Sequence, residues 1–366
     1  MSITSRHRRI GKWPLIIMAI IAIVVLVCGI WGYRFLYKSV IDLGARKQTS
    51  LYLPQGVTFD ELCQLLELDS ALIDRDNLST VASLMGAKDQ IRHGHYRLRS
   101  GMSARQLMNL LRSGNQSPIR VTFNNCRTLA QVAGKVSHFL EADSLDILAA
   151  MEDKQLMAEL GFNENSIPAM YLPNTYEMFW TASGEDWVRR MKSEYDKFWN
   201  AQRMYKADSI GLTPKEVVTL ASIVEEETNK VADYPIIAGL YLNRIRKGML
   251  LQACPTLKYC KGDFTIRRVL NSDKEIDHPY NTYKYPGLPP GPIRVTTGAA
   301  IDAVLNADDN DYLFMCARPD YSGLHNFART VAQHERNARE YQAWLNTQKI
   351  YRYVFFCSCL NSCIIY

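Results

Sequence analysis

The chain has 366 residues, of which 47% are hydrophobic and 22% charged, and its formal net charge is +6. This length suggests about two or three domains, and the composition is that of a globular protein with one membrane segment. Because the positive charge is small and lies partly at the N-terminus, it gives no support to nucleic-acid binding. The sequence contains no convincing internal repeat and no extended low-complexity run.

The N-terminus predicts a membrane anchor. A basic tail, residues 1–12, precedes Trp13–Tyr33, a stretch without charged residues. As a helix this stretch spans about 30 Å, the thickness of a bilayer core, and tryptophans stand near both of its ends. It is too long for a cleaved signal peptide and lacks a small-x-small cleavage pattern. We therefore expect a transmembrane helix at 13–33.

The basic tail also predicts the orientation of this helix. The positive-inside rule keeps the tail in the cytoplasm, although Arg34 and Lys38 weaken the bias without reversing it. We expect a single-pass protein of the inner (cytoplasmic) membrane, with a juxtamembrane linker at 34–50 and an extracytoplasmic, periplasmic body.

The nine cysteines predict no metal site. They form no CxxC pair, and no zinc-type spacing with His partners appears. Disulfides are permitted outside the membrane, but the spacing assigns no pairing, and buried free thiols are the default. Neither a metal nor a cofactor is expected.

Residues 51–118 predict a compact α/β unit. Gly56–Leu66 and Ser103–Leu111 have the apolar spacing of amphipathic helices, and His95–Leu98 alternates like a short strand. Small units of two strands and two helices are common both as carbohydrate-binding domains and as structural adaptors, and the pattern does not choose between them.

Residues 119–208 predict a mixed region that contains an aromatic turn. A strand at Val121–Phe123 is followed by helices at Thr128–Phe139, Ser144–Leu160 and Ser183–Tyr205. Between the last two helices, Tyr171–Trp180 places aromatic rings around a Pro-Asn-Thr turn. Such rings either line a sugar-binding cleft or form core beneath a loop, and the second is the more common case.

Thr213–Asn229 carries the most complete helix signals in the chain. Thr213 suits the N-cap, and Glu216 completes a T-x-x-E capping box with it. Apolar residues then recur at helical spacing, so one face is expected to be buried.

Three adjacent glutamates end this helix, and their side chains point about 100° apart. Glu225 falls beside the apolar face, where desolvation raises the pKa of a carboxyl, as a general acid at neutral pH requires. Glu226 is expected to be the most solvated of the three. Clustered glutamates on a helix are more often only a solvated face, so the pattern alone does not establish catalysis.

The region after this helix predicts a rigid loop between regular elements. Asp233–Lys247 is expected to form a helix capped by Asp233, and Tyr280–Ile293 is rich in Pro and Gly. Loops of this kind with polar residues at their start often line binding sites. A helix at Thr297–Asn306, a strand at Asp311–Ala317 and a final helix to about Gln348 follow.

An ordered set of short motifs runs through the second half of the chain. They are L-A-S-I-V-E-x-E-T at Leu220–Thr228, N-R at Asn243-Arg244, G-M-x-L-Q at Gly248–Gln252, P-T at Pro255-Thr256, Y-N-T-Y at Tyr280–Tyr283, G-L-P-P-G-P-I at Gly287–Ile293, and His325, Phe327 and His334. Leu53–Phe59, His93–Leu98 and Leu172–Tyr176 add upstream matches. Together these motifs resemble the YceG-like family, the endolytic murein transglycosylases, over about 51–348.

The resemblance implies an α+β fold in several parts. After the N-terminal transmembrane helix, it implies a small LysM-like α/β domain at 51–118 and a connecting α/β region at 119–208. A larger mixed α+β catalytic transglycosylase domain is implied at 209–348.

The resemblance also implies a reaction and an acid. The family cleaves the β-1,4 bond between N-acetylmuramic acid and N-acetylglucosamine within nascent peptidoglycan strands, without water, and so limits strand length. The product ends in 1,6-anhydro-muramic acid. One carboxyl can act first as general acid and then as base, and Glu225, the first Glu of the V-E-x-E-T motif, is assigned both roles.

Five further residues are expected to bind substrate on the strength of the motifs. They are Glu227, Gln252, Thr256, Asn281 and Tyr283. Amide and phenol groups suit the recognition of N-acetyl and hydroxyl groups. The alternatives are a capping or salt-bridge role for Glu227, and for the loop residues that they only tie the rigid loop together.

Two features depart from the family pattern. Cys254 stands where the family usually has Asp, which puts any role of that carboxylate in doubt. Residues 349–366 form an apolar, Cys-rich tail too short and too interrupted for a second membrane span.

Two other functions remain open at this point. A peptidoglycan hydrolase (muramidase) would need a second carboxylate near Glu225, for which Asp233 and Glu227 are candidates. A non-catalytic peptidoglycan-binding scaffold would not need Glu225. Peptidoglycan strands are the expected partner, and we hypothesise that peptidoglycan synthases in the same membrane are another.

Overall fold

The computed structural model describes residues 12–266 and 269–348. The predicted 349–366 tail and nearly all of the basic tail lie outside the described residues. The chain divides into two compact units, one of 1–119 with 177–181 and one of 120–176 with 182–366. The predicted regions 119–208 and 209–348 thus fall almost entirely within one unit. The elements confirm the mixed α+β fold, whereas the LysM-like character of the first unit stays a prediction.

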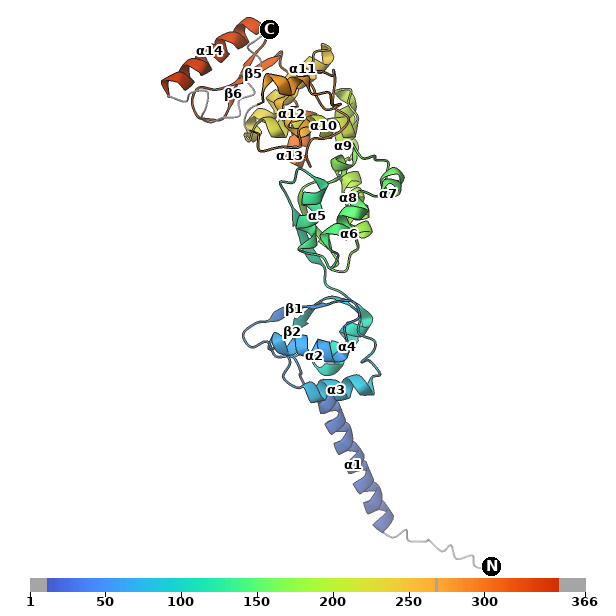
Figure 1. Cartoon of the computed structure of the whole chain (residues 1–366). Helices are drawn as coiled ribbons and strands as arrows, with labels where there is room; N and C mark the ends of the chain where they lie inside the picture. Colours follow the sequence, from blue (N-terminus) through green and yellow to red (C-terminus); the bar gives the residue numbers. More distant parts are fainter. Residues whose placement is uncertain (1–11, 267–268, 349–366) are drawn as a thin grey trace, which may run out of the picture. The chain divides into compact units, whose positions relative to one another are not determined.

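The first unit begins with a long apolar helix. Helix α1 covers Lys12–Tyr37 and so continues past Tyr33 (Figure 1). Its segment Ile16–Tyr37 has a mean hydropathy of 2.7 and none of it is buried, so by length and composition it is able to cross a membrane. Phe35 and Leu36, in its last turn, pack against the core of the first unit.

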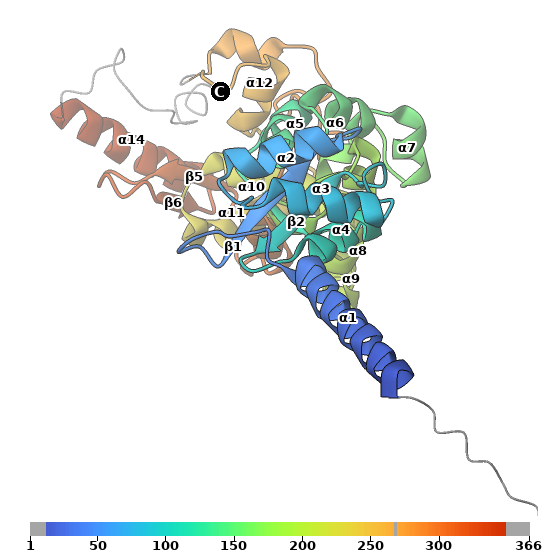
Figure 2. The same cartoon turned by 90° about the horizontal axis from the view of Figure 1, so that it is seen from below.

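A strand–helix–helix–strand arrangement forms the body of this unit. Its elements are β1 (Gln48–Leu53), α2 (Phe59–Leu68), α3 (Arg75–Leu84), β2 (Gly94–Arg99) and α4 (Ala104–Ser113). Strands β1 and β2 are antiparallel, with Gln48 opposite Arg99 and Leu53 opposite Gly94. Helix α2 packs against β1 and α3 packs against α4 (Figure 2), around a core that includes Tyr96.

The next elements, almost all of them in the second unit, are helices around a two-stranded sheet. The elements are β3 (Ile119–Phe123), α5 (Leu129–Ser137), α6 (Ser144–Met151), α7 (Lys154–Glu159), the 3₁₀ turn η1 (Ile167–Met170), β4 (Asn174–Met178), α8 (Gly184–Phe198) and α9 (Ala201–Ser209). Strand β3 pairs with β4. Tyr171 and Tyr176 of the aromatic turn are buried, and Tyr176 lies edge-on to Trp187, so these two rings are core.

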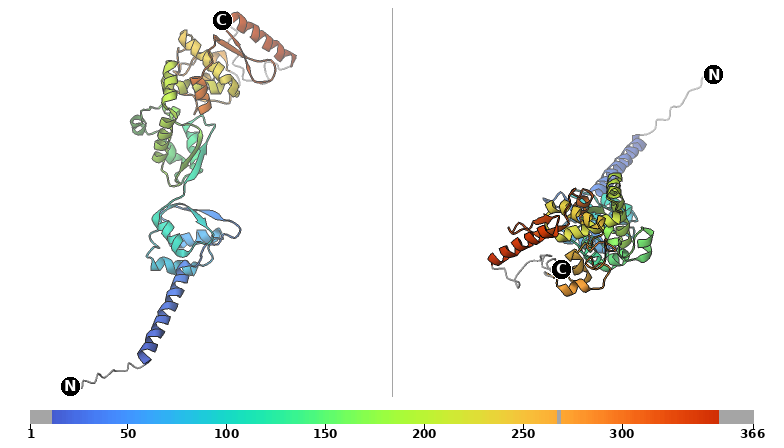
Figure 3. Two further views of the ribbon diagram at one scale, coloured as in Figure 1. Left: turned by 180° about the vertical axis from the view of Figure 1, so that it is seen from behind. Right: turned by 90° about the horizontal axis from the view of Figure 1, so that it is seen from above.

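The remaining elements surround one central helix. They are α10 (Pro214–Glu227), η2 (Val231–Asp233), α11 (Tyr234–Arg246), α12 (Cys254–Cys260), η3 (Asn271–Glu275), α13 (Gly298–Leu305), β5 (Phe314–Ala317), β6 (His325–Ala328) and α14 (Val331–Thr347). Helix α10 packs against α9, α11, α12 and α13. Strands β5 and β6 form an antiparallel hairpin, and α14, red in Figure 3, packs beside it.

Candidate functional site

Helix α10 carries Glu225 into the interior of the second unit. The predicted capping box forms, because the Thr213 hydroxyl accepts the N–H of Glu216 while the Glu216 carboxylate accepts the N–H of Thr213. Every residue from Val217 to Glu225 is buried, and Glu225 itself is 8% exposed. A carboxyl group in such a place requires polar partners, because burying it without them is costly.

Two groups from one segment hold the Glu225 carboxyl. The main-chain N–H of Thr297 donates to Oε2 at 3.0 Å. Thr297 is also the N-cap of α13, so the positive end of that helix faces the carboxyl. The Arg294 Nη2 atom lies 3.6 Å from Oε1. Both oxygens therefore have a fixed neighbour, and the group has a defined orientation.

The expectation that Glu226 is solvated is wrong. Its side chain is 10% exposed, and its Oε1 accepts hydrogen bonds from Arg294 Nη1 at 2.9 Å and Arg127 Nε at 3.0 Å. Both arginines come from loops distant in the sequence, which the periodicity of a helix cannot place. The carboxylate of Glu226 thus offsets the charge of the same guanidinium that neighbours Glu225.

The segment from Ile293 to Thr297 is fastened to α10 at two points. The fully buried Ser222 hydroxyl accepts the N–H of Ile293 at 3.0 Å and donates to the Thr219 carbonyl at 2.7 Å. Ser222 lies one helical turn before Glu225, which accepts the N–H of Thr297. These contacts align the segment with the helix and place Arg294 over the two glutamates.

The Pro- and Gly-rich loop before this segment is held by close packing. A Cβ at Gly291 would lie 1.9 Å from the carbonyl oxygen of Asn165, so only glycine fits there. Asn281 is fully buried, and its amide donates to the carbonyls of Lys274 and Ile276, each at 2.8 Å. Its Oδ1 atom accepts the N–H of Tyr283 at 3.0 Å.

The start of this loop also joins the segment around α12. The Thr256 hydroxyl is fully buried, donates to the Ala253 carbonyl at 2.7 Å and lies 2.9 Å from the hydroxyl of Thr282. Gln252 has a left-handed backbone, with φ of 53°, and its N–H donates to the Thr282 carbonyl. Its amide oxygen accepts from Arg244 at 3.3 Å. The contacts of Thr256 and Asn281 match the loop-tying alternative, and sugar binding by these residues stays a prediction.

The remaining substrate-binding candidates lie on different elements. Glu227 accepts a hydrogen bond from the Tyr241 hydroxyl at 2.6 Å. The Tyr283 hydroxyl lies 3.1 Å from the Cys254 sulfur, which is buried. Gln252, Thr256, Asn281 and Tyr283 are thus joined through one loop, whereas Glu225 is held by the segment from Arg294 to Thr297.

Asp233 has a partner that sequence reasoning did not identify. The expectation that its side chain caps α11 is wrong, because it makes no capping hydrogen bond. Its Oδ2 instead accepts the N–H of His325 at 3.1 Å and lies 2.9 Å from the Nδ1 of that residue. Asp233 thus binds a residue distant in the sequence instead of capping its own helix.

Four functional candidates were missed from the sequence: Arg127, Ser222, Tyr234 and Arg294. Burial raises the pKa of the Tyr234 phenol, as do the nearby carboxyls of Glu225 and Glu226, and Arg294 opposes them. The phenol is therefore protonated at neutral pH and available as a donor near Glu225. The one sequence signal for Arg294 was its place directly after the rigid loop; nothing local marked Arg127.

Comparison with known proteins gives a family match over most of the chain. Residues 51–340 match the model of the YceG-like family. The chain is 26% identical to an endolytic murein transglycosylase of Bacillus subtilis, over 85% of this chain and 90% of that protein. It is 27% identical to one of Streptococcus pneumoniae, over 86% of this chain and 62% of that longer protein.

A solved structure supports the fold. The crystal structure of a putative YceG-like protein from Listeria monocytogenes aligns with a TM-score of 0.52 and 24% identity. The alignment covers 79% of this chain and 98% of that one.

Proposed function

The chain belongs to the YceG-like family, and we propose that it is a membrane-anchored endolytic lytic transglycosylase that acts on nascent peptidoglycan. The names of its relatives in Bacillus and Streptococcus support this activity. The observation that carries the proposal is the buried carboxyl of Glu225, held between the Thr297 amide and the Arg294 guanidinium.

The proposed reaction needs one carboxyl group. Protonated Glu225 gives its proton to the oxygen that links C1 of N-acetylmuramic acid to C4 of N-acetylglucosamine, and the C1–O bond breaks. The resulting carboxylate takes the proton of the C6 hydroxyl while that oxygen attacks C1. The strand is cut, a 1,6-anhydro ring forms, Glu225 is again protonated, and no water is consumed. Cutting within strands would limit their length.

The neighbours of Glu225 have distinct proposed roles. The Thr297 amide fixes one carboxyl oxygen, and the other, which lies 3.6 Å from Arg294, is proposed to be the one that meets substrate. Glu226 offsets part of the charge of Arg294, the guanidinium that lies 3.6 Å from the Glu225 carboxyl. Tyr234 supplies a protonated phenol near the same carboxyl.

Substrate contacts are proposed for three of the predicted residues. Glu227, Gln252 and Tyr283 are partly or fully accessible and carry groups that suit sugar hydroxyls and N-acetyl groups. Thr256 and Asn281 are proposed to hold the loop on which those residues depend.

A hydrolase is less well supported by the same contacts. Activation of water would require a second carboxylate close to Glu225. Asp233 already binds His325, and Glu227, which accepts a hydrogen bond from Tyr241, is proposed above to contact substrate instead of water. A scaffold without activity would not require the fixed orientation of Glu225.

The proposed activity and helix α1 together indicate where in the cell the protein acts. We propose that α1 spans the inner membrane with the N-terminus in the cytoplasm, which places both compact units on the periplasmic side, where peptidoglycan is assembled. Synthases that polymerise glycan strands in that membrane are proposed partners. Repeated co-purification in mild detergents without any synthase would count against them.

The proposal is tested by mass spectrometry of products from purified protein and uncrosslinked glycan strands. We expect anhydro-muramyl ends from the wild type and at least a hundredfold fewer from Glu225→Gln, because general acid–base catalysis contributes about 10²–10⁴-fold. Glu152→Gln makes the same change at an exposed position of the second unit and is expected to leave activity unchanged.

Each other outcome selects an alternative. Reducing muramic acid ends would identify a hydrolase. Absence of cleavage by folded wild-type protein would favour a binding scaffold. Equal cleavage by the wild type and Glu225→Gln would remove Glu225 from the reaction.

A further inference from the structure

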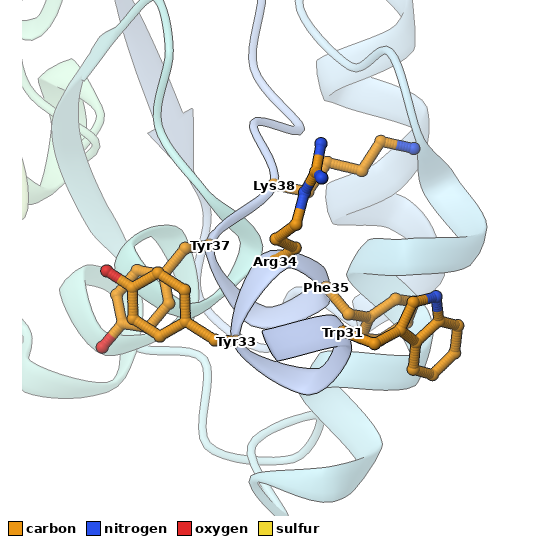
Figure 4. Close-up of a pocket in the computed structure, with 6 residues that line it drawn as sticks. All are labelled: Trp31, Tyr33, Arg34, Phe35, Tyr37 and Lys38. Atoms are coloured by element: carbon orange, nitrogen blue, oxygen red, sulfur yellow. The ribbon is translucent and has the colours of Figure 1, made fainter. Parts of the chain in front are cut away.

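The last turns of α1 carry side chains that the proposed reaction does not use. They line a hollow of about 670 Å³ (Figure 4). The lining residues, which we call the collar, are Trp31, Tyr33, Arg34, Phe35, Tyr37 and Lys38.

The collar is built from pairs of residues four positions apart, which lie on the same side of a helix. One aromatic pair stacks with ring centroids 5.8 Å apart, and the other has its centroids 4.5 Å apart. Figure 4 shows Arg34 and Lys38 between the two aromatic pairs. The result is a basic stripe with an aromatic wall on either side.

The exposure of these rings indicates a lipid surface. Trp31 is 70% exposed and Tyr33 64% exposed, at the end of a helix with an apolar surface. Rings with a polar edge are stable in this state where headgroups meet hydrocarbon, since the ring enters the apolar layer and the polar edge stays hydrated.

The charge of Arg34 then requires a counter-charge. The positive-inside rule disfavours cations at the outer end of a span, yet Arg34 and Lys38 stand there. Lys38 has one carboxylate neighbour, Asp74 at 2.6 Å, and its side chain remains 59% exposed. Arg34 is exposed and points into the same hollow.

We propose that the collar binds the phosphate of an anionic phospholipid headgroup in the outer leaflet. The guanidinium of Arg34 is the main contact, because its planar donors fit phosphate oxygens, and Lys38 is the second. The aromatic pairs pack against the glycerol and the upper acyl chains. This inference rests on the proposed membrane anchoring and is independent of the proposed reaction.

Fluorescence of Trp31 tests the proposal in full-length protein. Trp13→Phe leaves Trp31 as the only tryptophan of α1, and in the proposed arrangement the other four tryptophans lie outside the bilayer, so the part of the fluorescence that brominated lipid quenches comes from Trp31. This variant is placed in phosphatidylcholine vesicles with a fixed fraction of brominated phosphatidylglycerol, or the same fraction of brominated phosphatidylcholine. We expect stronger quenching by the anionic lipid. Arg34→Ala should lower that preference about fivefold, since a basic residue at an anionic surface contributes about 1 kcal/mol, and Arg34→Lys should retain most of it.

The controls separate the collar from a general charge effect. In a Trp31→Phe protein, Trp13 reports on the opposite end of the span, and Arg34→Ala is expected to leave its quenching unchanged. Cleavage of soluble glycan strands by Arg34→Ala should also be unchanged, which distinguishes failure of this proposal from failure of the proposed reaction.

Two results would overturn the proposal. Equal quenching of Trp31 by the two brominated lipids would show that the collar has no preference for an anionic headgroup. Loss of the preference when glycerol phosphate is added at constant ionic strength would show a site for soluble phosphate instead of a lipid.

Discussion

At the scale of single residues, the sharing of Arg294 between two glutamates determines what each can do. Arg294 is 8% exposed, and its closest partner is Glu226 at 2.9 Å. Glu226→Gln is expected to cost about 3 kcal/mol in the free energy of unfolding, because it leaves a buried cation under-compensated. It should also lower the rate of cleavage, since Arg294 loses its closest partner and is no longer held beside Glu225. Urea unfolding and the cleavage rate of folded protein measure these effects. A purely structural role would change stability alone, and Glu226→Asp, which keeps the charge, should keep most of the rate.

At the scale of elements, the β5–β6 hairpin and α14 enclose a histidine that makes them sensitive to acid. His334 is 4% exposed, stacks on Phe314, and neither of its ring nitrogens has a hydrogen-bond partner among the described residues. Burial and the charge of Arg244 lower its pKa below the usual value. In the unfolded chain the same histidine has a pKa near 6.5. As the pH falls, the unfolded chain therefore binds a proton at a higher pH than the folded protein does.

The free energy of unfolding is therefore expected to fall as the pH is lowered. Neutral His334 makes its full contribution to the free energy of unfolding above about pH 6.5. This contribution is lost as the pH falls toward the pKa of His334 in the folded protein, by at most about 1.4 kcal/mol per pH unit. His334→Phe is expected to remove this loss and so to stabilise the protein more at pH 5.5 than at pH 8. Denaturant unfolding at the two values measures the difference. Equal stabilisation at both would contradict the assignment.

At the scale of the whole molecule, helix α1 contains the apolar segment and, in its last turn, residues that pack in the first folded unit. Phe35 and Leu36 pack against the core, and the Phe35 carbonyl accepts a hydrogen bond from Asn77 at 3.1 Å. A protein that begins after Tyr33 keeps these contacts, and one that begins after Tyr37 loses them. We expect the shorter protein to be less stable by about 2 kcal/mol, because two partly buried apolar side chains and one hydrogen bond are lost. Thermal unfolding of the pair is the measurement, and equal stability would place the unit boundary after Tyr37.

The predictions that succeeded were local in the sequence. The capping box of Thr213 and Glu216 forms within one turn, and the spacing correctly put Glu225 beside a buried face. The expectation that only one face of this helix is buried is wrong, because every residue from Val217 to Glu225 is buried. Local patterns also predicted a solvated side chain for Glu226 and a capping side chain for Asp233, and both predictions were wrong. Their actual partners are Arg294 and His325, which come from distant segments. A single sequence contains no spacing that relates such residues, so their pairing depends on the assembled fold.

The donor to Glu225 Oε2 is a main-chain group, and this limits what genetics can detect. Alanine at position 297 would keep the N–H, so a scan of side chains would pass over the contact that orients the carboxyl. Among the twenty amino acids, only proline removes that donor. The position can therefore vary in side chain among functional proteins while the atom that serves the site is retained in all of them.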